Sequence, residues 1–326
     1  MKMNKGRVQV EHLTAEPGSK VEGYLRVGEM QDGTPIRIPF AIINGRYPGK
    51  TLYIQAASDG NELNGIAVIQ YLLQRIDPSS LHGAIIAVPI ANPMAFHHLR
   101  SHSPVDGMKM NRCFPGKPDG TYSERIAYRL YHSAVKKADL CIDLHQGGVG
   151  RMIDEVRVRV GEGNRCYRES LELARVFGLG YILDKMGPDG QLARVAPEDG
   201  IPTIDPELGG THGWDIESIR RGIQGVVNVL RYYGFLPGQP KIPSRQIVAH
   251  DFKEVIANRG GFLSMRAELG DNLKEGDPVA EILDPFGNVV ERIKSTCHGV
   301  LWSHKPYPMA SSGEVIATLG VEISYI

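Results

Sequence analysis

Acidic and imidazole side chains follow three separate apolar runs of this sequence, and their types are those of metal ligands. Asp59 and Glu62 lie after the first run, His145 ends the second, and Glu207 ends the third. One imidazole and two carboxylates are a suitable ligand set for a divalent metal and leave a position open for water. A further carboxylate that does not bind the metal could serve as a general base.

The first two carboxylates lie in the segment YIQAASDGNELNG, residues 53–65, where a short apolar run gives way to a helical pattern. Apolar residues recur at helical spacing from Leu63 to Leu73, which predicts a helix over residues 62–76. Two carboxylates three residues apart at its first turn can point into one pocket. Asp is also a favoured N-cap residue, and Glu62 suits the positive end of the helix dipole, so this segment fits helix capping as well as metal binding.

The other two candidates also have structural interpretations. His145 could be a core histidine bonded to the backbone, and Glu207 could accept hydrogen bonds from the amides of Gly209 and Gly210. Independent structural causes would, however, have to coincide at three strand ends. Because open α/β sheets place their sites at the carboxyl ends of strands, the joint occurrence favours one shared site.

Strand-like and helix-like patterns alternate along residues 1–240. Residues 1–50 alternate polar and apolar positions, with Asp32-Gly33 as a turn, and predict a β meander. The elements expected after it are a helix at 62–76, a strand at 84–89, a helix at 123–137, strands at 139–145 and 153–160, a helix at 166–177, a strand at 201–208 and a helix at 215–233. Residues 97–120 predict a long ordered loop. The alternation predicts an α/β fold, a mixed β-sheet flanked by helices.

The last part of the chain has a different texture. Residues 236–244 contain three prolines and predict a linker. Short β-type runs separated by Gly, Asp and Pro follow it, without a long helical period. The sequence therefore predicts two domains, a catalytic domain at 1–240 and a small all-β domain at 241–326.

The composition is that of an ordinary globular protein. Lys+Arg and Asp+Glu are balanced at 37 each, which argues against binding of nucleic acid. No segment has the apolar length of a signal peptide or a membrane span, and the four cysteines form no CxxC pair. We expect a cytoplasmic protein that acts on a small molecule, with free thiols and no membrane partner; self-association into a homo-oligomer is left open.

Several short motifs occur in an order that is typical of one family. They are DGNE at 59–62, NP at 92–93, DG at 106–107, NRCFPG at 111–116, DLH at 143–145 and ELG at 207–209. With this order, about residues 40–235 resemble the succinylglutamate desuccinylase/aspartoacylase family of the zinc carboxypeptidase superfamily. The resemblance implies a zinc-carboxypeptidase-like fold and a zinc-dependent deacylase, an amidohydrolase that cleaves an N-acyl bond.

The resemblance also implies roles for individual residues. Glu62 and His145 would bind Zn²⁺, and Glu207 would activate water as the general base. Asn111 and Arg112 would hold a carboxylate of an N-acyl amino acid-like substrate, for which a guanidinium is well suited. The family usually has an arginine ahead of the NRCFPG motif that polarises the scissile carbonyl, and Arg100 is the nearest candidate here.

Two positions depart from the family pattern. Asp59 stands where the family has its first zinc-binding His, and Lys109 precedes Met110-Asn111 where the family often has Asp. A ligand set of Asp59, Glu62 and His145 could favour Mn²⁺, Fe²⁺ or Co²⁺ over Zn²⁺ or bind metal more weakly. The alternative function is therefore a catalytically impaired homologue that binds a ligand or a partner.

The C-terminal segment resembles the barrel-sandwich module of lipoyl and biotinyl domains. Carrier modules of that type present a lysine at a hairpin tip, usually within Met-Lys-Met. Such a triplet occurs at residues 108–110, but it lies about 150 residues before the module. The missing hairpin lysine argues against a carrier protein and predicts a structural appendage.

Overall fold

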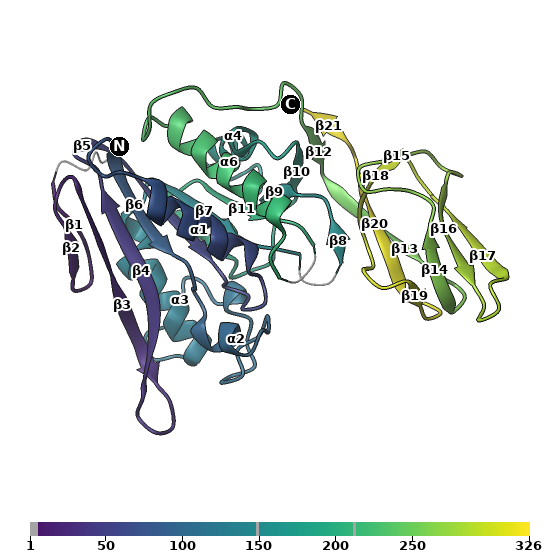
Figure 1. The fold of residues 1–326 in the computed structure, drawn as a ribbon, viewed down its shortest axis with the longest axis horizontal. Helices are drawn as coiled ribbons and strands as arrows, with labels where there is room; N and C mark the ends of the chain where they lie inside the picture. Colours follow the sequence, from purple (N-terminus) through teal and green to yellow (C-terminus); the bar gives the residue numbers. More distant parts are fainter. Residues whose placement is uncertain (1–5, 148–149, 211–212) are drawn as a thin grey trace.

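A ten-stranded mixed sheet forms the centre of the computed structural model, which describes residues 6–147, 150–210 and 213–326 (Figure 1). Its strand order is β21-β12-β10-β9-β11-β7-β5-β6-β4-β3. The strands are β3 (Ser19–Glu29), β4 (Pro35–Asn44), β5 (Tyr47–Ala56), β6 (His82–Val88), β7 (Leu140–Leu144), β9 (Glu155–Val158), β10 (Tyr181–Asp184), β11 (Thr203–Glu207), β12 (Ile247–Ala249) and β21 (Ser324–Tyr325).

The middle of this sheet brings the predicted strand ends together. β6, β5, β7 and β11 are neighbours and run parallel, so their carboxyl ends meet at one edge. A bridge between His145 and Glu207 extends the β7–β11 ladder by one pair. β9 runs antiparallel to β11 and places Glu155 opposite Glu207. The sheet topology alone therefore gathers residues that are more than 140 positions apart in the sequence.

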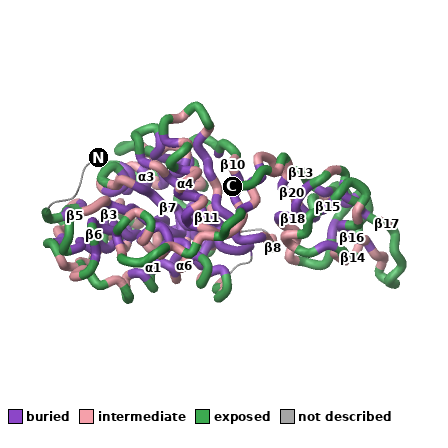
Figure 2. The backbone as a smooth tube through the Cα atoms, turned by 90° about the horizontal axis from the view of Figure 1, so that it is seen from above, coloured by how far each residue is buried: buried purple, intermediate pink, exposed green. Residues whose placement is uncertain are grey.

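Helices cover both faces of the sheet, because alternate residues of its central strands point into two separate cores. The core around Leu52, Ile54 and Ile142 is shared with α1, α4 and α6, and the core around Tyr53 and Cys141 with α3 and α5. Figure 2 shows β7 and β11 as buried segments between these layers. The helices are α1 (Asn64–Arg75), α2 (Pro93–His97), α3 (Tyr122–Ser133), α4 (Tyr167–Phe177), α5 (Leu192–Val195) and α6 (Ile216–Tyr232), with 3-10 turns η1 (Met110–Arg112), η2 (Val135–Lys137) and η3 (Ala196–Asp199).

Two antiparallel sheets with their own core follow the large sheet at the right of Figure 1. The first has the order β13-β20-β18-β15, formed by β13 (Asp251–Ile256), β20 (Val315–Val321), β18 (Gly299–His304) and β15 (Asn272–Leu273). The second has the order β17-β16-β14-β19, formed by β17 (Val289–Lys294), β16 (Pro278–Leu283), β14 (Gly261–Met265) and β19 (Met309–Ala310). All of these eight strands come from the C-terminal segment for which β-type runs were predicted.

The two parts of the chain are tied together in several places. β8 (Arg151–Met152), from the segment after His145, pairs with β18 of the C-terminal part. β12 and β21 come from the C-terminal part but pair at the edge of the large sheet. The predicted division at residue 240 remains a prediction.

The α/β fold is confirmed, with differences in detail. The turn at Asp32-Gly33 joins β3 to β4, but β1 (Val8–Val10) and β2 (Leu13–Ala15) form a separate two-stranded sheet. Part of the expected loop at 97–120 is the 3-10 turn η1. β10 was not predicted, because this strand is only four residues long and ends in Asp184. Within the described ranges, no helix has both the length and the apolar character that crossing a bilayer requires.

Candidate active site

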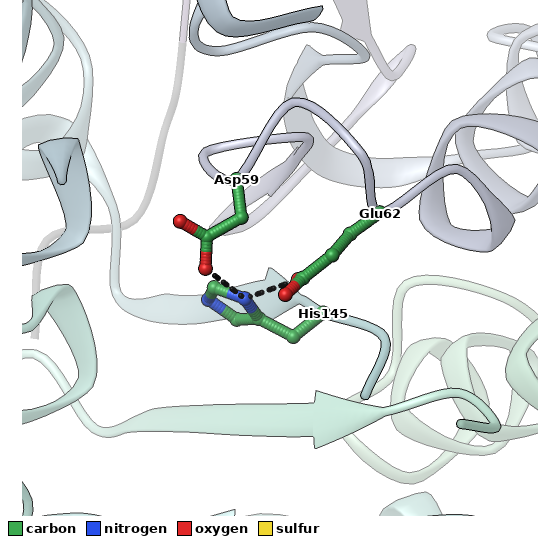
Figure 3. A group of neighbouring side chains, drawn as sticks. All are labelled: Asp59, Glu62 and His145. Atoms are coloured by element: carbon green, nitrogen blue, oxygen red, sulfur yellow. Dashed lines mark hydrogen bonds and ion pairs between the residues drawn. The ribbon is translucent and has the colours of Figure 1, made fainter. Parts of the chain in front are cut away.

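Asp59, Glu62 and His145 converge at the carboxyl edge of the sheet, and all three are buried (Figure 3). One ligand atom from each lies within 4.8 Å of the other two. His145 Nδ1 is 2.7 Å from Glu62 Oε2 and 3.8 Å from Asp59 Oδ2. The three residues come from the β5–α1 loop and the end of β7, as the sequence predicted.

The helix-capping interpretation of Asp59 and Glu62 is wrong. α1 begins at Asn64 with Leu63 at the N-cap, and neither carboxylate caps it. Instead Gln146 Oε1, from the residue after His145, accepts hydrogen bonds from the amides of Leu63 and Asn64 at 3.0 and 3.1 Å. A side chain from a neighbouring strand end thus does the capping, which leaves both carboxylates free to face His145.

His145 is surrounded by polar side chains on its other edge as well. Its Nε2 lies 3.2 Å from Asp143 Oδ2, 3.6 Å from Asp205 Oδ1 and 3.0 Å from the amide nitrogen of Asn111. Burial by itself would lower the pKa of His145, but the carboxylates of Asp205, Asp143 and Glu62 outweigh it and raise this pKa well above its usual value. The imidazole is therefore fixed by contacts at both ring nitrogens.

Burial also changes the protonation of Glu62. Its removal from water raises the pKa of this carboxyl to about 8, and the nearby carboxylates of Asp59 and Glu207 act in the same direction. The contact with His145 opposes this shift. In addition, the amide of Gln146 donates a hydrogen bond of 3.0 Å to Glu62 Oε2. A cation next to Glu62 would favour the ionised carboxylate that a metal ligand needs.

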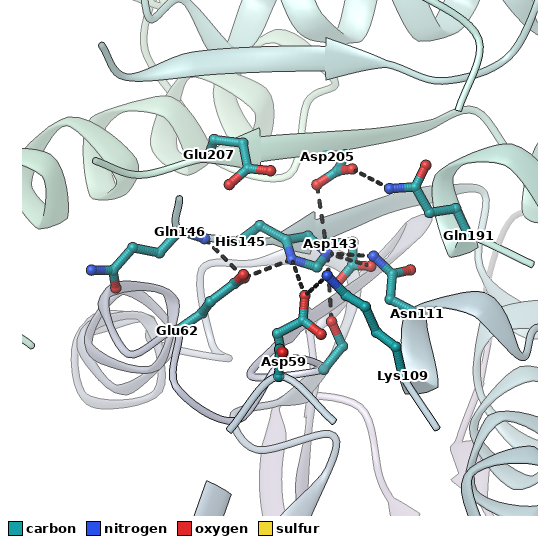
Figure 4. Close-up of polar contacts among 12 residues, drawn as sticks. Asp59, Glu62, Lys109, Asn111, Asp143, His145, Gln146, Gln191, Asp205 and Glu207 are labelled. Atoms are coloured by element: carbon teal, nitrogen blue, oxygen red, sulfur yellow. Dashed lines mark hydrogen bonds and ion pairs between the residues drawn. The ribbon is translucent and has the colours of Figure 1, made fainter. Parts of the chain in front are cut away.

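Asp59 has a cationic partner that was not predicted. Lys109 Nζ lies 2.8 Å from Asp59 Oδ2, where the segment before η1 passes the β5–α1 loop (Figure 4). The side chain of Lys109 is 28% exposed, whereas that of Asp59 is 1% exposed. The other oxygen, Asp59 Oδ1, is buried without a hydrogen-bond partner among the residues that the structure describes.

Glu207 is held at one oxygen and free at the other. Its Oε1 lies 2.7 Å from Arg157 Nη1, while its Oε2 is buried without a hydrogen-bond partner in the described part of the chain. Arg157 also donates from Nε to Glu155 Oε1 at 2.6 Å. Glu155 Oε2 in turn accepts a 2.6 Å hydrogen bond from the indole Nε1 of Trp302 in β18. A buried polar chain therefore runs from the C-terminal sheet to Glu207.

A cavity of about 570 Å³ opens onto Glu62, Glu207 and Arg157. One side carries Asn61, Glu62, Lys109, Arg157 and Glu207, and the other side carries C-terminal residues that include Phe252, Trp302 and Lys305. This volume lies in the range of small-molecule sites. The C-terminal sheet thus forms a wall of the candidate active site.

The predicted substrate-binding residues lie in different surroundings. Asn111 is buried and contacts His145, and its Oδ1 accepts from the amide of Leu192 at 3.3 Å. Arg112 is exposed and donates to the carbonyl of Asn111, and Arg100 is exposed at the loop after α2. Neither arginine is among the described residues that line the cavity. The structure brings the metal-ligand candidates and Glu207 together but leaves these two arginines outside.

The residues present fit a divalent metal ion. Two buried carboxylates and an imidazole nitrogen are a suitable donor set, and Asp59 Oδ1 is an unpaired buried oxygen that a cation would satisfy. Asp143 Oδ2 lies within reach of the opposite ring nitrogen of His145, the position at which carboxylates orient metal-binding imidazoles. Lys109 is at odds with a bound cation, because it already pairs with Asp59.

The sequence interpretation missed several residues of this site. Asp143 and Asp205 alternate with His145 and Glu207 along β7 and β11, so the two-residue period of a strand could have indicated that each pair faces one side. Arg157 and Trp302 carry no such signal. Their contacts depend on β9 running antiparallel to β11 and on the position of the C-terminal sheet.

A mixed α/β sheet whose parallel strands end in this cluster defines a protein with a candidate metal centre at the carboxyl edge. Residues 48–233 match the succinylglutamate desuccinylase/aspartoacylase catalytic domain. The chain therefore belongs to the succinylglutamate desuccinylase/aspartoacylase family, which confirms the resemblance of its motifs. N-alpha-acetyl-L-2,4-diaminobutyric acid deacetylase from Halomonas elongata is 28% identical over 295 residues, 87% of this chain and 85% of that protein.

Solved structures agree with this assignment. The product-bound ectoine utilization protein EutE (DoeB) from Ruegeria pomeroyi is 25% identical with a TM-score of 0.82, over 93% of this chain and 95% of that one. A succinylglutamate desuccinylase from Silicibacter sp. TM1040 is 25% identical with a TM-score of 0.83, over 99% of this chain and 100% of that one. The relatives from Halomonas elongata and Silicibacter sp. TM1040 are deacylases by name, and the likeness extends over both parts of the chain.

Proposed function

We propose that this protein is a metal-dependent deacylase that hydrolyses the amide bond of a small, carboxylate-bearing N-acyl amino acid. The observation that carries the proposal is the pairing of His145 with Glu207 across β7 and β11, with Glu207 Oε2 unpaired and both residues beside Glu62. A general base and a cluster of ligand atoms within 4.8 Å of one another are what such a hydrolysis needs. Membership of a family of deacylases supports the same reaction.

In this proposal Asp59, Glu62 and His145 hold the metal, Zn²⁺ or another divalent transition metal. When bound, the metal would polarise the scissile carbonyl and make water acidic enough to react near neutral pH. Glu207 takes the proton of the attacking water at Oε2 and passes it to the leaving amine. Arg157 keeps Oε1 occupied, which directs proton transfer to the free oxygen Oε2.

The substrate carboxylate needs a cation in the cavity. Arg157 lines the cavity and is one candidate, although its guanidinium is shared between Glu155 and Glu207. Arg112 and Arg100 were predicted for this role, and they would have to reach the cavity from exposed positions. The roles of Asn111, Arg112 and Arg100 stay predictions.

The test is an assay of the full chain, supplied with Zn²⁺, Mn²⁺ or Co²⁺, against a panel of N-acetyl and N-succinyl amino acids. We expect amide hydrolysis with at least one metal, and a loss of roughly 10²-fold or more in kcat for Glu207→Gln with metal binding retained. Glu198→Gln, which changes an exposed carboxylate on η3, should match the wild type. Absence of turnover across the panel with every metal would reject the proposal.

That negative outcome would favour the alternative, a homologue that binds a ligand without hydrolysing it. The ion pair between Lys109 and Asp59 is the observation on its side, since it occupies a ligand position with a cation of the chain itself. Binding of the same panel, measured by calorimetry without metal, would then distinguish a ligand-binding protein from one with a different substrate.

A further inference from the structure

The two positions at which the sequence departs from its family pattern contact each other. Asp59 replaces the first His, and Lys109 replaces an acidic residue 50 positions later. In the structure Lys109 Nζ lies 2.8 Å from Asp59 Oδ2 (Figure 4). The two replacements therefore compensate each other, because the carboxylate of Asp59 and the ammonium of Lys109 form an ion pair. Either replacement without the other would leave a charge without its partner.

The position of Lys109 makes it a competitor for a metal ion. Its ammonium binds Asp59 Oδ2, the oxygen of that carboxylate that lies 3.8 Å from His145 Nδ1. It lines the cavity and is partly exposed, so its long side chain has room to leave Asp59. A divalent ion bound by Asp59 would have to displace the ammonium or share the carboxylate with it, and in a buried site repulsion between two cations is strong.

We propose that Lys109 is a resident counter-cation of the metal site, which neutralises Asp59 and weakens divalent-metal binding. The inference rests on the metal site of the proposed function. The ion pair holds the Asp59 side chain in place when no metal is present, and it makes occupancy of the site depend on the available metal concentration. The unpaired Asp59 Oδ1 is the oxygen through which a metal could bind while Lys109 still holds Oδ2.

The primary experiment measures Zn²⁺ affinity of the full chain by competition with a chromophoric chelator. Lys109→Met should bind Zn²⁺ at least about tenfold more tightly than the wild type, because a positive charge next to the ion is removed. Lys109→Arg keeps the charge and should stay near the wild type. Lys305→Met is the matched control, since Lys305 lines the same cavity but pairs with Glu314 on the C-terminal wall.

A double-mutant cycle tests whether the two departures act as one unit. Asp59→His places an imidazole beside the ammonium, and Lys109→Asp places two carboxylates side by side. The double variant removes both conflicts, so it should bind Zn²⁺ more tightly than the two single effects predict when added. It also keeps the test decisive if Lys109→Met does not fold, which circular dichroism would reveal.

Equal or weaker Zn²⁺ binding by Lys109→Met, or additive effects in the cycle, would overturn the proposal, as would a lack of Zn²⁺ binding by every variant. These readouts do not involve turnover. If Lys109→Met gains Zn²⁺ affinity while no chain hydrolyses any substrate, the counter-cation stands and the deacylase function fails. If the chain hydrolyses a substrate while the Zn²⁺ affinities of the variants do not change, the deacylase function stands and the counter-cation proposal fails.

Discussion

At the residue scale, the side chain of His145 is oriented by residues outside the candidate metal-ligand set. Its Nδ1 faces Glu62 and Asp59, so the proton has to reside on Nε2 for Nδ1 to act as a ligand. Asp143 Oδ2 is 3.2 Å from Nε2 and can accept that proton in a hydrogen bond. Asp143 is itself held by a 2.9 Å hydrogen bond from Gln55, which accepts from Tyr53 at 2.8 Å.

This arrangement predicts that Asp143→Asn weakens metal binding by roughly 10- to 100-fold, because the amide no longer fixes the tautomer and orientation of His145. Zn²⁺ affinity of the purified variant, from chelator competition, is the measurement. Asp154→Asn is the control, since it removes another buried carboxylate that pairs with Arg221 instead. Equal affinities for the Asp143 variant and the wild type would show that Asp143 does not orient the imidazole.

At the scale of elements, the site depends on the junctions between strands and helices. The β5–α1 loop carries both carboxylates. At the start of α1, the amides of Leu63 and Asn64 donate hydrogen bonds to the side chain of Gln146. Asn64 contributes a second link, since it donates to the carbonyl of Leu208 at 2.8 Å and accepts from the amide of Asp215 at 2.9 Å. The start of α1 is therefore fixed to the ends of β7 and β11, which are the other two sides of the site.

Gln146→Ala should lower the free energy of unfolding by about 1 kcal/mol, the usual effect of removing a helix cap, and should also weaken Zn²⁺ binding. Asp215→Ala removes the N-cap of α6, whose carboxylate accepts from the amides of Glu217 and Ser218, and should cost a similar amount without changing Zn²⁺ binding. Urea unfolding and chelator competition measure the two effects. If both variants alter Zn²⁺ binding equally, the role of Gln146 is general stability.

At the scale of the whole molecule, the C-terminal sheet β13-β20-β18-β15 lines the candidate site. Trp302 packs against Tyr181 and Phe252, with ring centroids 5.6 and 5.8 Å away, and its indole N–H donates to Glu155 in β9 of the large sheet. Burial raises the pKa of Glu155, and the positive charge of Arg157 opposes this shift. The carboxylate of Glu155 therefore depends on its donors, Arg157 and Trp302, to stay charged. Trp302 in the cavity wall is thus linked to Glu207 through Glu155 and Arg157.

Trp302→Phe keeps the ring but removes the donor to Glu155. We expect a loss of about 1–2 kcal/mol in the free energy of unfolding, because a buried acceptor is left unsatisfied, together with a several-fold lower kcat and unchanged Zn²⁺ affinity. Tyr181→Phe is the control, because it changes a ring that packs against Trp302 and leaves the hydrogen bond from Trp302 to Glu155 in place. If the Trp302 variant loses stability but retains the full kcat, the contacts from Trp302 through Glu155 and Arg157 to Glu207 have a structural role only.

The sequence by itself determined the elements and the residues that could do chemistry. Strand and helix periods placed α1, α4, β11 and α6 within a few residues of their observed bounds, since periodicity reports which positions are buried. Motif order gave the family, and the positions of Asp59, Glu62, His145 and Glu207 after apolar runs indicated one shared edge. These inferences succeed because they depend on neighbours in the chain.

Only the tertiary structure decided which interpretation of those residues applies. Whether Asp59 caps a helix or faces an imidazole depends on Gln146, 87 residues further on, and its partner Lys109 lies in a loop without periodicity. Trp302 reaches Glu155 across 147 residues. Such contacts are set by strand order, strand direction and the packing of one sheet against another, and local sequence patterns do not encode them.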